Sequence, residues 1–521
     1  MRKKKKLLTI LLAVCLVAAM MPSMVFAANA KSDDIVVLYT NDVHCGIDDS
    51  IGYAGLAAYK ADKLKETKNV VLVDAGDAIQ GDLAGALSKG DYIVDIMNQV
   101  GYDVAVPGNH EFDFGMDQFL ALTKKSNAKY ISSNFTDTKA NKTVFDPYVI
   151  KELGGKKVAF VGISTPESIT KSTPAFFQDE KGNYIYDFCN DKTGKKLYKA
   201  VQNAIDAAKA EGADYVIALG HMGIDDQSKP WTSREVIANT TGLNAFIDGH
   251  SHSTVASEAV KDKDGKEVTL SQTGTKLAAI GELIITADGK ISTSLVTDYA
   301  AKDEKTASLI KEVKDKIEAV SSKKVGTSEV LLTTLDAEGK RAVRNQETTM
   351  GNFCADAYRI IGGADIGVVQ GGGVRADIKA GDVTYGDIIA LHPWGNMYGV
   401  IEATGQQILD ALELGCGCNE TRPCLHGNDQ ASPLSEAVDP LCGGKIFHCP
   451  AHILLVDLRQ RLANGRHVRG IQLFAHVGNA VLRQDLSIDA DLVIRRRGAA
   501  GLCKGQLEII VTGKAQRTAK P

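Results

Sequence analysis

The sequence has no strong excess of charge of either sign, because 60 Lys and Arg stand against 64 Asp and Glu and give a formal net charge of −4. Proteins that bind nucleic acid polymers usually carry a basic patch, so this balance gives no electrostatic reason to expect such a partner. Beyond the first thirty residues, the sequence also contains no apolar run long enough to cross a bilayer. Both absences fit an ordinary globular composition with 44% hydrophobic and 24% charged residues.

Cysteine is scarce in most of the chain. Residues 31–415 contain only Cys45, Cys189 and Cys354, and three isolated cysteines predict no disulfide framework there. The last part of the sequence is different, because six cysteines gather in it: Cys416, Cys418, Cys424, Cys442, Cys449 and Cys503.

The first thirty residues have the layout of a secretory signal peptide. Arg2 to Lys6 form a basic segment, Leu7 to Met21 form an apolar run, and small residues follow, with Ala27 or Ala30 at the end of the cleavage site. A membrane anchor is the alternative, but the run is short for a span and no charged stop-transfer pattern follows. We therefore expect removal of residues 1–30 and a mature chain that is secreted: extracellular, periplasmic or associated with the cell wall.

A length of 521 residues predicts two or three domains. From Asp34 onwards, short apolar runs rich in β-branched residues alternate with helical patterns such as Lys195 to Ala210, and each run ends in a polar loop. This order predicts a mixed α/β sandwich that collects ligands at the carboxyl ends of its strands. The predicted organisation is a first domain at 31–302, a charged linker helix at 303–322, a second α/β module at 323–415 and an atypical tail at 416–521.

Seven residues of the types that bind metal ions lie in five short segments where predicted strands give way to loops. Any one of these segments is weak evidence, because Asp and His before Gly are common turn residues. As an ordered set they favour a two-metal hydrolytic centre, and their mixed nitrogen and oxygen ligands suit Zn, Mn, Fe or Co better than Ca or Mg. The residues are Asp42, His44, Asp77, Asn109, His221, His250 and His252.

A further polar pair follows Asn109. His110 and Asp113 are three residues apart in the segment NHEFD, close enough for the carboxylate to orient the imidazole. A histidine held in this way is suited to protonating a leaving alkoxide. The alternative is that His110 is a metal ligand or a structural histidine; we favour the acid, because the ligand positions are already filled.

The motifs DVH, GD, GNHE, GH and GHSH occur in the order that is typical of the calcineurin-like metallophosphoesterases. With its signal peptide and second module, the chain resembles the secreted 5'-nucleotidase family, which includes periplasmic UDP-sugar hydrolases and 2',3'-cyclic-nucleotide phosphodiesterases. The resemblance covers about residues 34–415 and implies a four-layer αββα sandwich, a linker helix and a second α/β domain, which here is incomplete. It also implies two ligand sets that share one carboxylate: Asp42, His44, Asp77 and His252, then Asp77, Asn109, His221 and His250. His110 and Asp113 would be the catalytic dyad.

In this family the second domain holds the nucleoside. Arg344 in VRNQETTMGN and Arg375 in GGGVR match the substrate arginines, whose planar fork meets phosphate or sugar oxygens; an ordinary surface arginine is the alternative. Trp394 in ALHPWGN matches an aromatic residue that stacks on the base, with Asn396 nearby. A core tryptophan is the alternative for Trp394, but the Pro and Gly beside it favour a loop.

The resemblance implies a secreted dinuclear-metal phosphoesterase that converts nucleoside 5'-monophosphates to nucleoside and phosphate. Two alternatives stay within the enzyme class, namely a UDP-sugar hydrolase and a 2',3'-cyclic-nucleotide 2'-phosphodiesterase. A third belongs to another class, a non-catalytic nucleotide-binding protein of the cell surface. The complete set of ligand positions favours an enzyme.

The tail departs from the family pattern and from the composition of the rest of the chain. Residues 1–415 contain 40 Lys and 6 Arg, whereas residues 416–521 contain 4 Lys and 10 Arg and lack Tyr and Trp. One codon bias seldom changes in this way, so we hypothesise that the tail is translated out of frame from a point between Gly415 and Cys449. The alternatives are a divergent tail and a metal knuckle of Cys416, Cys418, Cys424 and Cys442, whose spacing fits no usual zinc template.

Resequencing of the gene tests this hypothesis. We expect a shift of the reading frame between the codons for Gly415 and Cys449. A verified, uninterrupted frame through residue 521 would contradict it.

Overall fold

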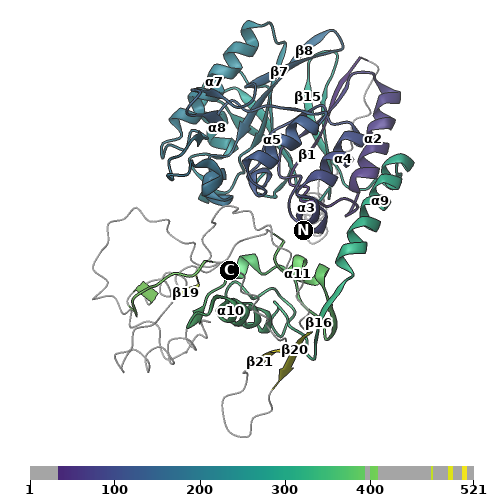
Figure 1. Ribbon diagram of the computed structural model, residues 1–521. Helices are drawn as coiled ribbons and strands as arrows, with labels where there is room; N and C mark the ends of the chain where they lie inside the picture. Colours follow the sequence, from purple (N-terminus) through teal and green to yellow (C-terminus); the bar gives the residue numbers. More distant parts are fainter. Residues whose placement is uncertain are drawn as a thin grey trace, which may run out of the picture.

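The computed structural model describes residues 33–393, 399–405, 407–408, 471–472, 491–496 and 507–512. The predicted signal peptide, Trp394, Asn396 and most of the atypical tail lie outside the described residues. Figure 1 shows the first domain and the second module as two parts, with helix α9 running along one side from the first to the second.

The first domain is built around two six-stranded mixed sheets. In one sheet the strand order is β15-β14-β1-β2-β3-β4. The pairs among β1, β2, β3 and β4 are parallel, whereas β14 and β15 are antiparallel to their neighbours. The strands are β1 (Ile35–Thr40), β2 (Val70–Asp74), β3 (Val104–Ala105), β4 (Lys129–Tyr130), β14 (Ile280–Ile285) and β15 (Ile291–Val296).

The second sheet has the order β12-β13-β11-β10-β8-β7. Parallel pairs join β8, β10, β11 and β13, and the antiparallel strands β7 and β12 form the edges. The strands β1, β2, β3, β8, β10 and β11 correspond to the predicted apolar runs that end in polar loops, and each takes part in a parallel pair, as do β4 and β13. The strands are β7 (Tyr148–Leu153), β8 (Lys156–Ser164), β10 (Tyr215–His221), β11 (Ala245–Ile247), β12 (Thr254–Lys261) and β13 (Glu267–Thr273).

The two sheets pack face to face, and helices cover both outer faces. Val37 and Val71 of the first sheet meet Phe160 and Ile217 of the second in one buried core. A second core lies between the first sheet and α2 (Gly52–Glu66), α4 (Asp91–Val100) and α5 (Met116–Lys125), and a third between the second sheet and α7 (Lys195–Ala210) and α8 (Ser233–Asn239). The four-layer αββα sandwich is thus confirmed.

A cluster of phenylalanines fixes the short segment that begins with His110. Phe112, in the 3₁₀ turn η1 (His110–Phe112), makes edge-on contacts with Phe119, Phe135, Phe177 and Phe188 at centroid distances of 5.0–5.4 Å. All five rings are buried, and edge-on aromatic pairs add directional attraction to the burial of apolar area. The remaining short elements are α3 (Leu83–Ser88), α6 (Ser168–Lys171), η2 (Pro174–Phe177), η3 (Asp226–Ser228), and the small sheet of β5 (Thr136–Asp137), β6 (Lys142–Thr143) and β9 (Tyr186–Asp187).

The predicted linker helix is present as α9 (Glu304–Ser321). Its N-cap is Asp303, whose side chain accepts a hydrogen bond from the Thr306 backbone N–H at 2.8 Å. Ile310 and Val313 are buried against the first domain, and the helix also contacts α11 (Tyr385–Leu391) of the second module.

The second module packs on a separate small core that includes Leu332, Met350, Phe353 and Val374. Its elements are β16 (Lys324–Ser328), α10 (Thr349–Gly362), β17 (Ile366–Gly367), η4 (Gly371–Gly373), β18 (Gly381–Thr384) and α11 (Tyr385–Leu391). Three described segments of the tail extend these sheets: β19 (Ile471–Gln472) pairs with β17, β20 (Asp491–Arg496) pairs with β16, and β21 (Leu507–Thr512) pairs with β20.

Cys45, Cys189 and Cys354 are free thiols. Within the ranges that the structure describes, no helix combines the length and the apolar character needed to span a bilayer.

We expect Phe160→Ala to lower the free energy of unfolding by about 3–5 kcal/mol, because it leaves a cavity between the two sheets where Phe160 is fully buried. Urea unfolding of the mature chain measures the loss. Leu64→Ala is the matched control, since Leu64 is 47% exposed on α2, and a similar loss in both variants would contradict the assignment of the core.

Candidate active site

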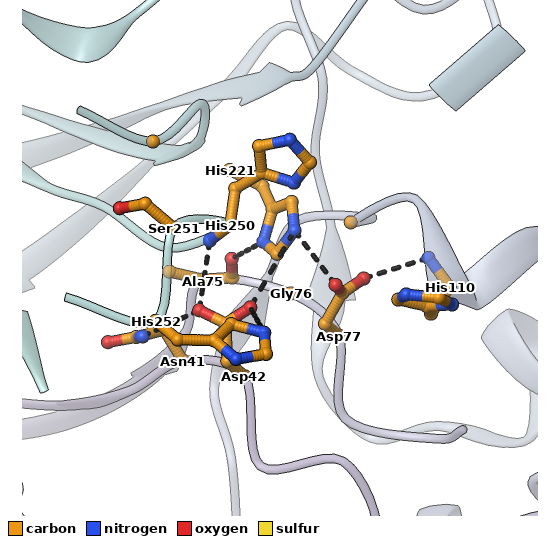
Figure 2. Close-up of polar contacts among 12 residues, drawn as sticks. Asn41, Asp42, Ala75, Gly76, Asp77, His110, His221, His250, Ser251 and His252 are labelled. Carbon is orange, nitrogen blue, oxygen red and sulfur yellow. Dashed lines mark hydrogen bonds and ion pairs between the residues drawn. The ribbon is translucent and has the colours of Figure 1, made fainter. Parts of the chain in front are cut away.

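The seven predicted ligand residues converge at the carboxyl ends of parallel strands. Asp42 and His44 follow β1, Asp77 follows β2, and Asn109 follows β3 in the first sheet. His221 is the last residue of β10, and His250 and His252 follow β11 in the second sheet. Figure 2 shows five members of this set, Asp42, Asp77, His221, His250 and His252, gathered in one place.

Five of the seven residues have a left-handed backbone: Asp42 (φ 51°), His44 (φ 47°), Asp77 (φ 60°), His250 (φ 81°) and His252 (φ 53°). Non-glycine residues adopt this conformation at a cost of about 1–3 kcal/mol, and such residues cluster at functional sites. These turns shape the loop after β1, in which His44 Nε2 lies 3.9 Å from Asp42 Oδ1.

Two glycines allow the ligand loops to approach closely. A Cβ atom on Gly108 would lie 2.2 Å from Asp77 Oδ1, and one on Gly249 would lie 2.9 Å from His221 Nδ1. Any larger residue at either position would therefore displace a predicted ligand.

The ligand atoms form two adjacent groups. The first group consists of Asp42, His44 and His252, and the second consists of Asp77, His221 and His250. Within each group, the ligand atoms lie within 4.8 Å of one another. Asp77 connects the groups, because its Oδ2 lies 3.1 Å from His221 Nε2 and 3.8 Å from His44 Nε2.

Three side-chain atoms of the predicted ligands are buried without a hydrogen bond within the described part of the protein. Asp42 Oδ1, Asn109 Oδ1 and His221 Nε2 are buried and have no hydrogen bond. By contrast, Asp42 Oδ2 accepts hydrogen bonds from His250 N at 2.9 Å and Asn41 Nδ2 at 2.7 Å (Figure 2). Buried polar atoms without partners are costly, and these three have the chemistry of metal donors, so the residues fit two divalent cations.

Backbone carbonyls fix which histidine nitrogen is available to an ion. His44 Nδ1 donates to Gln80 O at 2.8 Å, and His221 Nδ1 donates to Ala75 O at 2.7 Å. Each bond leaves Nε2 as the nitrogen that can face an ion. In metal sites, this type of contact orients the ring and raises its basicity.

The charges of the site are strongly perturbed by burial. Burial raises the pKa of the Asp42 carboxyl to about 7 and lowers the pKa of His44 to about 3. Burial also opposes the charge of His221, but the carboxylates of Asp77 and Asp42 outweigh it and raise the pKa of His221 to about 10. A protonated His221 thus balances the carboxylates, and a bound cation has to displace that proton.

His110 lies beside the predicted ligands and belongs to neither of the two groups. Its Nδ1 donates to Asp113 Oδ2 at 2.6 Å, and its backbone N–H donates to Asp77 Oδ1 at 2.8 Å. Burial lowers the pKa of His110, but the carboxylates of Asp113 and Asp77 overcome this effect and raise the pKa to about 9. A protonated imidazole with its Nε2 directed away from Asp113 has the chemistry of a proton donor.

Sequence reasoning missed several residues that support the ligands. The buried carboxylate of Glu111 accepts backbone hydrogen bonds from Asp77, Ala78 and Gly108 at 2.7–2.9 Å and so fixes the Asp77 loop. Glu111 is the last residue of the GNHE motif, but the motif does not reveal that its carboxylate holds three backbone N–H groups.

Glu167 was missed as well, although a signal was present. Its Oε2 accepts from His250 Nε2 at 2.9 Å and from Ser228 Oγ at 2.7 Å, which leaves His250 Nδ1 for an ion. Burial raises the pKa of Glu167, but the hydrogen bond and charge of His250 lower it to about 2. Glu167 follows the carboxyl end of β8, as the ligands follow the other parallel strands.

The structure brings the two predicted substrate arginines to one loop. Arg344 lies against Gly372, where an added Cβ would be 3.2 Å from the guanidinium carbon, and Arg375 donates to Gly372 O at 3.2 Å.

The loop that leads to Trp394 does reach the ligand region. His392 Nδ1 donates to Gly373 O at 3.2 Å, and Gln80 Nε2 donates to Pro393 O at 3.2 Å. Since Gln80 O is the acceptor for His44 Nδ1, one residue connects the second module to a predicted ligand. Trp394 and Asn396 themselves lie outside the described residues.

Comparison with protein families gives two matches. Residues 35–254 match the model of the calcineurin-like phosphoesterases, and residues 324–436 match that of the 5'-nucleotidase C-terminal domain. The second match extends beyond residue 415.

Curated relatives and solved structures agree with these matches. The chain is 28% identical over 433 residues to the trifunctional nucleotide phosphoesterase protein YfkN of Bacillus subtilis, covering 73% of this chain but only 27% of that protein. It is 28% identical over 431 residues to a 5'-nucleotidase of Vibrio parahaemolyticus, covering 73% of this chain and 74% of that protein. A 5'-nucleotidase precursor from Thermus thermophilus has a similar fold, with a TM-score of 0.60, 24% identity, and coverage of 74% of this chain and 78% of that one.

We expect Glu167→Ala to weaken the binding of divalent cations about 10–100-fold, because His250 loses the acceptor that orients its ring. Titration of the metal-free protein with Zn²⁺ or Mn²⁺, followed by calorimetry, measures the change. Glu180→Ala, at an exposed position, is the control. Unchanged affinity in Glu167→Ala would show that this contact does not support a ligand.

Proposed function

We propose that this chain, which belongs to the calcineurin-like phosphoesterases that carry a 5'-nucleotidase C-terminal domain, hydrolyses nucleoside 5'-monophosphates to nucleoside and phosphate at a two-metal centre. The observation that carries the proposal is the pair of adjacent ligand groups, in which Asp42 Oδ1 and His221 Nε2 are buried without a hydrogen bond. A two-metal phosphoesterase requires two adjacent sets of ligands whose donor atoms are available to the ions.

Asp42, His44, Asp77 and His252 would hold one ion, and Asp77, Asn109, His221 and His250 the other. When bound, the two ions supply an activated water and positive charge for the oxygens of the phosphoryl group. We propose Zn, Mn, Fe or Co as the ions, because three carboxylate or amide oxygen donors and four imidazoles form a mixed set.

His110 would deliver a proton from Nε2 to the departing ribose oxygen. The carboxylate of Asp113 holds the opposite nitrogen at 2.6 Å, so the ring is oriented before the substrate arrives. The bond between His110 N and Asp77 Oδ1 fixes the donor relative to the ligand that the two groups share. Orientation of this kind lowers the entropic cost of proton transfer in the transition state.

The second module would hold the nucleoside. Arg344 and Arg375 would contact polar groups of the substrate, and Trp394, close to Asn396, would stack on the base. The hydrogen bond between Gln80 and Pro393 supports this assignment, because Pro393 directly precedes Trp394 and Gln80 contacts His44 through its carbonyl.

The place of action is part of the proposal. The basic segment Arg2–Lys6 and the apolar run Leu7–Met21 support export through a signal peptide, so that the enzyme would act on nucleotides outside the cytoplasm.

We expect the metal-loaded mature chain to release phosphate from AMP faster than from UDP-glucose or 2',3'-cyclic AMP. Preference for UDP-glucose or 2',3'-cyclic AMP would assign the alternative activity, and no phosphate release from any of the three would contradict the proposal that the chain is an enzyme.

His110→Ala should lower kcat for AMP by about 10²–10⁴-fold, because the leaving oxygen then lacks its proton donor. The same variant should retain normal metal content by elemental analysis, and loss of metal would make His110 a ligand instead.

A further inference from the structure

We propose that Ser172 is a positioning residue that fixes the proton donor His110 by way of Asp113. This inference rests on the proposed function, in which His110 protonates the leaving group. Ser172 is fully buried, and its Oγ donates a hydrogen bond to Asp113 Oδ1 at 2.8 Å. The other carboxylate oxygen, Oδ2, accepts from His110 Nδ1 at 2.6 Å. The three residues form one chain that runs from Ser172 to the imidazole.

The hydrogen bond from Ser172 restricts rotation of the Asp113 carboxylate, which would otherwise change the direction of its hydrogen bond with His110. A carboxylate turns easily about its terminal torsion, which is broad and two-fold. With Oδ1 held by Ser172, only Oδ2 is presented to His110, and the direction of the Nδ1–H bond is fixed. The Asp113 side chain is only 9% exposed, so water has little access to it. Without the Ser172 hydroxyl, Asp113 Oδ1 would lose a hydrogen-bond donor in this nearly buried place.

Ser172 is itself held in place at two points. It is the C-cap of α6, and its backbone N–H donates to Ser168 O at 3.1 Å. Further along the chain, Phe177 packs edge-on against Phe112 at 5.2 Å, so the segment after Ser172 is attached to the turn that carries His110. The hydroxyl therefore belongs to a segment that is attached on both sides of Ser172.

The same short segment contacts the metal ligands at its other end. Glu167, the residue before α6, accepts from His250 Nε2 at 2.9 Å. Helix α6 is a single turn, with Glu167 before it and Ser172 after it. Glu167 contacts His250 of the second ligand group, and Ser172 contacts Asp113 of the dyad. The segment from Glu167 to Ser172 therefore contacts both the second ligand group and the dyad.

The test compares two substrates of the metal-loaded mature chain. AMP has a ribose alkoxide as its leaving group and needs a proton, whereas bis(p-nitrophenyl) phosphate has a phenolate leaving group that departs without one. We expect Ser172→Ala to lower kcat for AMP roughly tenfold, the factor that corresponds to loss of one hydrogen bond to a charged group. The KM for AMP and the kcat for the aryl ester should stay within twofold of the wild-type values.

Ser168→Ala is the matched control. Ser168 lies in the same turn and is equally buried, but its Oγ has no hydrogen-bond partner, so this variant removes the same atom without touching the dyad. We expect its activity on both substrates to equal that of the wild type. Equal loss on both substrates in Ser172→Ala, or equal loss in both variants, would assign Ser172 a structural role and overturn the proposal.

A second measurement does not depend on turnover. In protein labelled with ¹⁵N-histidine, the Nδ1–H proton of His110 should give a downfield, slowly exchanging resonance that is absent from His110→Ala. We expect this signal to broaden or vanish in Ser172→Ala and to persist in Ser168→Ala, and its persistence in both would overturn the proposal. If the wild-type protein hydrolyses neither substrate, the proposed function fails instead, and the resonance still reports whether Ser172 orients the ring.

Discussion

The structure depends on a group of buried carboxylate and imidazole side chains at the edge where the carboxyl ends of the two sheets meet. Asp42 and Asp77 are nearly inaccessible, and His221 stands between them with its Nε2 directed at both (Figure 2). Such a set is unstable without compensating charge, since buried carboxylates lose their hydration. The left-handed turns, the close glycines and the carbonyl contacts to His44 and His221 all keep these groups together despite that cost.

The fold explains how residues distant in the sequence reach this space. Parallel strands bring all their carboxyl ends to one edge, and two such sheets placed face to face direct two sets of loops at each other. Asp42 and His250 illustrate this, because they are 208 residues apart and yet joined by a hydrogen bond of 2.9 Å. The second module adds contacts from outside the sandwich through Pro393.

Much of this arrangement could be predicted from the sequence, for physical reasons. Apolar runs such as residues 35–40 are buried on both faces, so their pattern survives as a strand, and the Asp, Asn or His after each run marks the loop. Strand β14 was not predicted, because it has the charged Glu282 at a fully buried position, where Lys63 Nζ pairs with it at 3.0 Å. Glu111 and Ser172 were also missed, since their partners are brought near only by tertiary packing. The domain boundaries, the roles of the site residues and the out-of-frame origin of the tail stay predictions.

The parallel pairing of β16 with β20 has a consequence for the length of the chain. Strand β16 has β18 on one side and β20, which comes from the tail, on the other. A chain that stops before residue 491 would leave one side of β16 as a row of unsatisfied amide and carbonyl groups. Open edges of this kind recruit strands from other molecules, so a shortened form would be prone to self-association through the second module rather than through the catalytic sandwich.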